Sequence, residues 1–184
     1  MALIKIYIDG RAIEVEKGTT LLQAAKSAGI KIPTHCSDDS LEPYGACRMC
    51  LVEITRNGRK RLVASCVYEV EEDLAVKTRT GEINKIRKMI IELTWPVMSQ
   101  YAAEYGAQED RFENENSDCA LCGKCVRACA ESDLGDIAYF KGRGIHRNID
   151  LTQDKDYDWG AYKKCMSFCP GGRLMKKIMR LWCE

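Results

Sequence analysis

Three cysteines at two-residue intervals, Cys119, Cys122 and Cys125, are the residues of this chain with the clearest chemistry. A fourth cysteine, Cys169, follows after 43 intervening residues and stands directly before Pro170. Thiolates are the usual protein ligands of iron–sulfur clusters, and three closely spaced thiolates with a distant fourth are typical of a cubane [4Fe–4S] cluster. We therefore expect these four cysteines to hold one such cluster.

A second group of cysteines precedes the first. Its members are separated by ten, two and fifteen residues: Cys36, Cys47, Cys50 and Cys66. Four thiolates can hold a two-iron [2Fe–2S] cluster, although the first gap is longer here than in plant-type ferredoxins. Gly45 and Ala46 precede the second of these cysteines. Their small size lets backbone N–H groups approach and donate hydrogen bonds to cluster sulfur.

Two other metal centres fit this second group less well. A structural zinc site usually uses two C-x-x-C pairs, and Cys47 with Cys50 is the only such pair before residue 117. A Rieske centre needs two histidine ligands on one iron, but the chain has only His35 and His146, which are not in paired motifs. We expect His35 to lie beside the cluster or on the surface, outside the ligand set.

Three cysteines remain outside both groups. Cys129 completes a C-x2-C-x2-C-x3-C run, and in two-cluster ferredoxins that fourth cysteine binds a second cubane. Here Cys129 and Cys165 would be its only ligands, which is two too few. We interpret both as spare buried thiols, and we assign no role to Cys183.

The composition favours an intracellular metalloprotein. The 184 residues include 11 cysteines, and the net charge is only +1. Residues 1–10 alternate like a strand instead of forming an export signal, and no run reaches the roughly 20 apolar residues of a membrane span. Clustered cysteines in such a chain indicate metal binding, and we expect a cytoplasmic protein. The sequence has no stripe of basic residues with interleaved aromatic residues, so nucleic-acid binding is not expected.

The first eighty residues predict two hairpins around one helix. The strands are expected at residues 3–8, 11–16, 51–55 and 60–66, with turns at 9–10 and 56–59. Thr20 and Gln23 form a capping-box pattern that begins the helix, and Gly29 ends it. We expect an α+β fold in which residues 1–80 form a β-grasp [2Fe–2S] ferredoxin domain.

The rest of the chain predicts a linker and a smaller domain. Apolar residues at helical spacing predict a helix over 82–94, stopped by Pro96, and the polar run 104–118 reads as a solvated connection. Residues 81–116 are therefore interpreted as a helical linker, and residues 117–184 as a small ferredoxin-like [4Fe–4S] domain. The segment 174–182 is expected to form an amphipathic helix that packs on this domain.

The motifs resemble one family in order along the chain. The loop 44–50, Y-G-A-C-R-M-C, followed by L-V-E-I, is similar to the N-terminal region of the large (75-kDa-type) iron–sulfur subunit of respiratory complex I. Similar domains occur in the small diaphorase subunit of NAD-linked hydrogenases and in NAD-dependent formate dehydrogenases. The likeness continues through C-A-L-C-G-K-C-V-R, D-L-G, G-R-G and C-P-G-G-R-L. It implies the same cubane ligands: Cys119, Cys122, Cys125 and Cys169.

One centre of that family is expected to be missing. The family carries a further cubane with one histidine and three cysteine ligands between the two clusters. Here Trp95 stands where a His-Pro would be expected, and no cysteine occurs from 67 to 118. We therefore expect electrons to pass directly between the two remaining clusters, or to centres on neighbouring subunits.

The resemblance implies an electron-transfer subunit of a multisubunit oxidoreductase. A flavoprotein partner would bind NAD(P)H, and the catalytic partner would be a hydrogenase, a formate dehydrogenase or another redox enzyme, including an electron-bifurcating complex. The chain shows no G-x-G-x-x-G, P-loop or nucleophile constellation, so no catalytic residue is predicted. A free ferredoxin-type carrier and an iron–sulfur redox sensor are the alternative functions.

Overall fold

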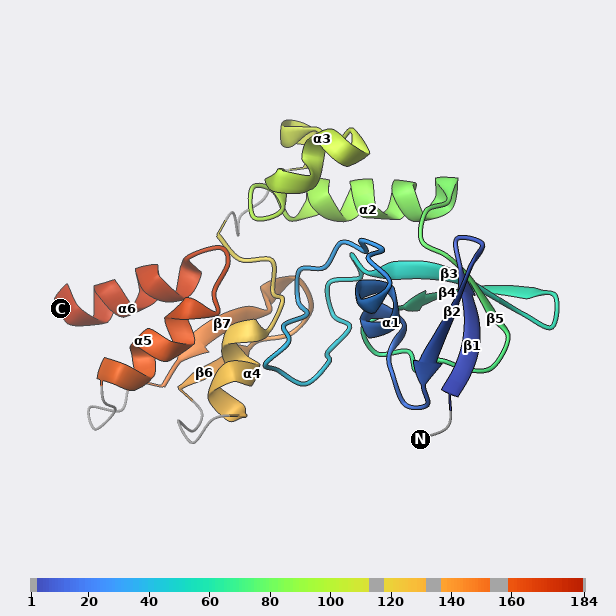
Figure 1. Cartoon of the computed structure of the whole chain (residues 1–184). Helices are drawn as coiled ribbons and strands as arrows, with labels where there is room; N and C mark the ends of the chain where they lie inside the picture. The colour runs from blue at the N-terminus through green and yellow to red at the C-terminus, as the bar shows by residue number, and fades with distance from the viewer. Residues whose placement is uncertain (1–2, 113–117, 132–136, 153–158, 184) are drawn as a thin grey trace.

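The computed structural model describes residues 3–112, 118–131, 137–152 and 159–183. Figure 1 shows a sheet-containing part, a smaller part with helices α4, α5 and α6, and the helices α2 and α3 above the junction. The loop between α1 and β3 extends from the sheet toward α4. A mixed sheet with helices agrees with the expected α+β class.

A five-stranded sheet forms the first part, in the order β2-β1-β5-β3-β4. Its strands are β1 (Leu3–Ile8), β2 (Arg11–Glu16), β3 (Leu51–Arg56), β4 (Arg59–Ala64) and β5 (Leu74–Lys77). The two expected hairpins are confirmed, and both turns contain positive-φ residues at Asp9-Gly10 and Asn57-Gly58. The sequence did not predict β5, which joins the hairpins by pairing parallel to β1 and antiparallel to β3.

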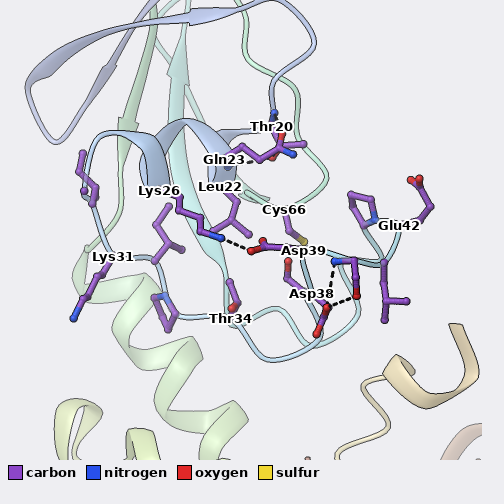
Figure 2. Close-up of a pocket in the computed structure, with 18 of the residues that line it drawn as sticks. Thr20, Leu22, Gln23, Lys26, Lys31, Thr34, Asp38, Asp39, Glu42 and Cys66 are labelled. Atoms are coloured by element: carbon purple, nitrogen blue, oxygen red, sulfur yellow. Dashed lines mark hydrogen bonds and ion pairs between the residues drawn. The ribbon is translucent and has the colours of Figure 1, made fainter. Parts of the chain in front are cut away.

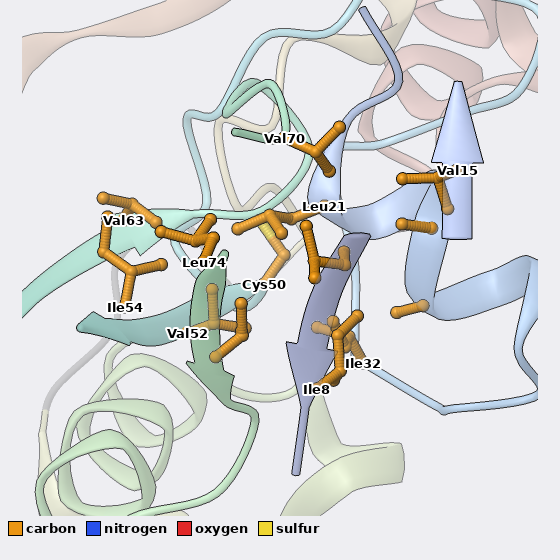
Figure 3. Close-up of a cluster of buried hydrophobic side chains, with 14 of the residues drawn as sticks. Ile8, Val15, Leu21, Ile32, Cys50, Val52, Ile54, Val63, Val70 and Leu74 are labelled. Atoms are coloured by element: carbon orange, nitrogen blue, oxygen red, sulfur yellow. The ribbon is translucent and has the colours of Figure 1, made fainter. Parts of the chain in front are cut away.

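Helix α1 (Leu21–Ser27) packs on one face of this sheet. The capping box is confirmed: Thr20 Oγ1 accepts from the Gln23 N–H at 3.3 Å, and Gln23 Oε1 accepts from the Thr20 N–H at 3.0 Å. Figure 3 shows the core between α1 and the sheet, where Leu21, Ile54 and Leu74 are almost fully buried. Cys50 and Cys66 belong to the same buried cluster.

Helix α2 (Gly81–Leu93) begins at the Thr80 cap, as the periodicity predicts. It is followed by the single-turn helices η1 (Ser99–Tyr101), α3 (Ala102–Tyr105) and η2 (Glu109–Arg111). The prediction of a merely solvated connection over 104–118 is therefore wrong in its first half. Arg111 Nη1 lies 2.6 Å from the buried Glu92 Oε2, so this segment folds back on α2. Residues 113–117 lie outside the described residues.

Arg87 ties α2 to the loop that precedes β3. Its side chain is fully buried. Nε donates to the Met49 carbonyl at 3.0 Å, Nη2 to the Leu51 carbonyl at 2.8 Å and Nη1 to the Tyr105 hydroxyl at 3.3 Å. The guanidinium thus satisfies two buried carbonyl groups on either side of Cys50.

The second part contains a small antiparallel sheet and three helices. Its elements are α4 (Lys124–Ala130), β6 (Ala138–Lys141), η3 (Gly144–His146), β7 (Asn148–Leu151), α5 (Trp159–Ser167) and α6 (Arg173–Cys183). The expected C-terminal helix is confirmed, and Leu174 and Ile178 bury its apolar face in the local core. Among the described residues, no helix has both the length and the apolar character that crossing a membrane requires.

Candidate metal centres

The structure brings the four cysteines of the first group together beside the sheet. They come from three segments: Cys36 from the loop after α1, Cys47 and Cys50 from the residues before β3, and Cys66 from the turn after β4. The Cys50 and Cys66 Sγ atoms lie 3.4 Å apart, and the Cys36 and Cys47 N–H groups donate to each other's sulfur at 3.4 Å. Three of the four side chains are buried. Four converging sulfurs, most of them shielded from solvent, are a suitable ligand set for a thiolate-bound cluster.

Hydrogen bonds polarise these thiols. The side-chain hydrogen bond with Cys47 lowers the pKa of Cys36 to about 5, and the hydrogen bond between the Cys50 and Cys66 thiols lowers the pKa of Cys50 to about 6. The same bonds, followed by burial, raise the pKa of Cys47 and of Cys66. Because the thiolate is the form that binds metal, two of the four sulfurs already favour the required state.

Backbone N–H groups also point at the sulfurs. The Gly45 N–H donates to Cys66, and the Ala46 N–H donates to Cys36. Gly45 has a φ of 67°, and a Cβ there would lie 3.4 Å from the Val67 side chain. Glycine suits the positive φ at position 45, and N–H donors of this kind stabilise anionic sulfur.

His35 is buried beside this group and not on the surface. Only 5% of the residue is exposed, and its Nε2 atom has no hydrogen-bond partner within the described part of the chain. Burial, followed by the charge of Lys124, lowers the pKa of His35 to about 4. The imidazole is therefore neutral at physiological pH.

A groove of about 1360 Å³ opens beside the first cysteine group (Figure 2). Cys66 lines it together with residues of α1 and of the loop 37–43. Carboxylates gather on that loop, where Lys26 pairs with Asp39 and Ser40 donates to Asp38. The groove gives an approach from the surface to an otherwise buried ligand position.

The second group of four cysteines lies at the N-terminal end of α4 and just after α5. Cys122 and Cys125 are buried, and Cys119 and Cys169 are half-buried. Burial, followed by the charges of the other three sulfurs, raises the pKa of Cys125 to about 12. Four thiolates this close together and this shielded need a cationic partner to offset their charge. The donor set therefore suits an iron–sulfur cluster.

No three His, Cys, Asp or Glu side chains of the described residues converge closely enough to hold a single metal ion. The ligands of a polynuclear cluster surround several irons instead of one point. The fit of both cysteine groups rests on their sulfur contacts, burial and mutual charge.

Gly171 lets the segment after Cys169 approach the segment before Cys119. A Cβ at Gly171 would lie 2.2 Å from the Asp118 carbonyl oxygen and 3.2 Å from the Val97 side chain. Arg173 Nε reinforces this contact at 2.6 Å from Asp118 Oδ1. The distant fourth cysteine is thus held against the first by backbone packing, which explains why a glycine follows Pro170.

Gly171→Ala is expected to separate these two segments. Overpacking against backbone costs about 1–3 kcal/mol, so both the free energy of unfolding and the iron content should fall. Urea unfolding and iron analysis measure the two effects. Gly81→Ala is the matched control, because a Cβ at Gly81 would meet nothing within 4 Å. Equal stability and iron content in the two variants would contradict the packing argument.

Cys129 and Cys165 are buried, as we expected, but the expectation that they are free thiols is wrong. Both residues are fully buried, and the structure joins them in a disulfide with a Cα–Cα distance of 6.0 Å. The bond links α4 to α5. Cys129 lies four positions after Cys125, and Cys165 lies four positions before Cys169, so their spacing in the sequence is similar to that of cluster ligands. The side chain of Cys183 lies outside the described residues.

Trp95 occupies the position at which the family resemblance implies a His-Pro. It is half-buried against a small cluster formed by Met49, Ile91 and Met98. Cys47 packs against the same cluster. Trp95 is therefore part of the apolar support of the first cysteine group.

Residues 1–81 match the family described as "2Fe-2S iron-sulfur cluster binding domain". The match spans the sheet, α1 and all four cysteines of the first group, and it supports a [2Fe–2S] cluster in this domain.

The chain as a whole is similar to subunits of NADH- and NADPH-linked oxidoreductases. It is 30% identical to the NADH-ubiquinone oxidoreductase 75 kDa subunit of Reclinomonas americana over 95% of the chain and 30% of that protein. It is also 30% identical to the NADPH-Fe(3+) oxidoreductase subunit alpha of Geobacter sulfurreducens over 95% of the chain and 24% of that protein. The chain therefore spans less than a third of these relatives.

A solved structure has the same arrangement over most of the chain. A chain of an NAD+-reducing [NiFe]-hydrogenase in the H2-reduced state superposes with a TM-score of 0.71 and 25% identity, covering 84% of this chain and 77% of that one. Together these matches confirm the resemblance to complex I 75-kDa-type subunits and to NAD-linked hydrogenases.

Proposed function

We propose that this chain is an iron–sulfur electron-transfer subunit of an NAD(P)H-linked oxidoreductase complex. Residues 1–80 form its [2Fe–2S] domain, 81–116 its linker and 117–184 its [4Fe–4S] domain. The [2Fe–2S] ligands are Cys36, Cys47, Cys50 and Cys66, and the [4Fe–4S] ligands are Cys119, Cys122, Cys125 and Cys169. When bound, each cluster accepts and releases single electrons.

The observation that carries this proposal is the presence of two separate, shielded sets of four cysteines on one small chain. The surrounding residues bury or half-bury the sulfurs of both sets and supply backbone N–H donors to them. The two sets lie on segments that contact each other. No residue is assigned a role in transforming a substrate. The similarity to NADH- and NADPH-linked oxidoreductase subunits supports this reading over a free carrier.

The partners follow from the same similarity. A flavoprotein that binds NAD(P)H would exchange electrons with one end of the chain, and a catalytic redox subunit such as a hydrogenase or formate dehydrogenase would do so at the other. The groove at Cys66 supports an exchange point at the [2Fe–2S] site, because it reaches a ligand that is otherwise 2% exposed.

Anaerobically purified protein is expected to contain about six iron atoms per chain, the sum of the two cluster stoichiometries. Dithionite reduction should give one [2Fe–2S] and one [4Fe–4S] EPR signal. Iron and sulfide analysis provides the count, and purification of the native assembly should recover a flavoprotein with the chain. A colourless or zinc-containing protein, or a chain isolated alone, contradicts the proposal.

A further inference from the structure

Helix α4 has two distinct faces. Cys125, Ala128 and Cys129 are buried in the core of the second domain. The other face contacts the first domain through residues spaced by three and four positions: Lys124, Arg127 and Glu131. Residues at this spacing lie on one side of a helix. A single helix therefore carries a candidate cubane ligand on one side and a contact to the [2Fe–2S] loop on the other.

Arg127 is the centre of this contact. Its Nη2 donates to the Cys36 carbonyl and its Nη1 to the Glu42 carbonyl. The guanidinium also lies 5.3 Å from the centroid of the Tyr44 ring. One side chain of the second domain thus holds both ends of the loop that contains the first cysteine of the [2Fe–2S] set.

Neighbouring residues strengthen the same contact. Lys124 Nζ lies 3.5 Å from Asp38 Oδ2, and Glu131 Oε2 accepts from the Glu42 N–H at 2.9 Å. The domains pack so closely that a Cβ on Gly123 would lie 3.1 Å from the Tyr44 ring. The two parts of the chain are therefore closely packed at this interface, and the Arg127 side chain lies within it.

We propose that Arg127 is a positioning residue that couples the two cysteine sites. It fixes the Cys36 segment relative to the helix that carries Cys125, and its permanent charge favours the reduced, more negative state of the [2Fe–2S] site. Arg127 itself exchanges neither an electron nor a proton. The inference rests on the proposed function, because it requires clusters at both sites.

The test compares Arg127→Gln, Arg127→Lys and the control Arg180→Gln, which removes the same charge from an exposed position of α6. EPR-monitored redox titration gives the midpoint potential of the [2Fe–2S] signal. We expect Arg127→Gln to lower the equilibrium constant for its reduction roughly tenfold, which is about 59 mV for one electron. The magnetic interaction between the two reduced centres should weaken as well. Arg127→Lys should keep most of the potential but lose part of the interaction.

The outcomes separate this inference from the function on which it rests. The inference is overturned if Arg127→Gln changes neither the midpoint potential of the [2Fe–2S] signal nor the magnetic interaction between the centres. It is also overturned if Arg180→Gln changes both quantities by the same amount. If Arg127→Gln does not retain iron, the test is made with Arg127→Lys alone. An unchanged magnetic interaction in Arg127→Lys then overturns the inference. Absence of one EPR signal in the unsubstituted protein instead overturns the proposed function.

Discussion

Cys169→Ser is expected to abolish the [4Fe–4S] EPR signal while the [2Fe–2S] signal remains. Three thiolates stay in place, but the fourth corner of the cubane loses its soft sulfur ligand, and a serine hydroxyl binds iron poorly in its place. The iron content should fall from about six atoms to about two. EPR of the dithionite-reduced variant, with iron analysis, measures the effect.

Cys129→Ser is the matched control for this prediction. Cys129 lies in the same cysteine run, but the structure bonds it to Cys165. Its replacement should lower the free energy of unfolding by about 2–4 kcal/mol, as loss of a disulfide typically does, and leave the cubane signal in place. The reverse pattern, a signal that survives in Cys169→Ser and disappears in Cys129→Ser, would make Cys129 the fourth ligand.

Arg87→Met is expected to destabilise the protein by about 2–6 kcal/mol, because it leaves two buried acceptors without a donor and each costs about 1–3 kcal/mol. Methionine has a similar length, but it leaves the Met49 and Leu51 carbonyls unpaired. These carbonyls flank Cys50, so the variant should also lose [2Fe–2S] signal intensity before it unfolds. Urea unfolding and EPR of the same sample measure both effects.

Lys85→Met controls for adding a methionine to α2. Lys85 is exposed on the same helix, and its replacement should change the unfolding free energy by less than about 0.5 kcal/mol. If the two variants unfold at the same urea concentration, the bonds from Arg87 contribute nothing to the stability of the cysteine loop.

Local sequence patterns predicted most of the elements that hold the cysteines. The Asp9-Gly10 and Asn57-Gly58 turns and the Thr20 capping box depend on residues within a few positions of one another, so their signals are visible in the sequence. The four-residue strand β5 was missed because it is stabilised by pairing with β1 and β3, not by its own composition.

The cysteine groups were visible from spacing, whereas the residues that support them were not. Arg127 contacts Cys36 across 91 positions, and Arg87 contacts Met49 across 38 positions. A single arginine on a helix carries no sequence pattern that reveals a partner so distant along the chain. The disulfide between Cys129 and Cys165 was hidden for a different reason, since its cysteines lie inside a spacing that is typical of cluster ligands.

Cys50 and Cys66 belong to the same buried cluster as Leu21, Ile54 and Leu74. The proposed cluster ligands and the packing of the sheet therefore share atoms in this domain. A cavity opened among the aliphatic side chains would admit dissolved oxygen to the thiolates, even if no cysteine were altered. The lifetime of the holoprotein in air is accordingly a property of core packing as much as of the coordinating residues.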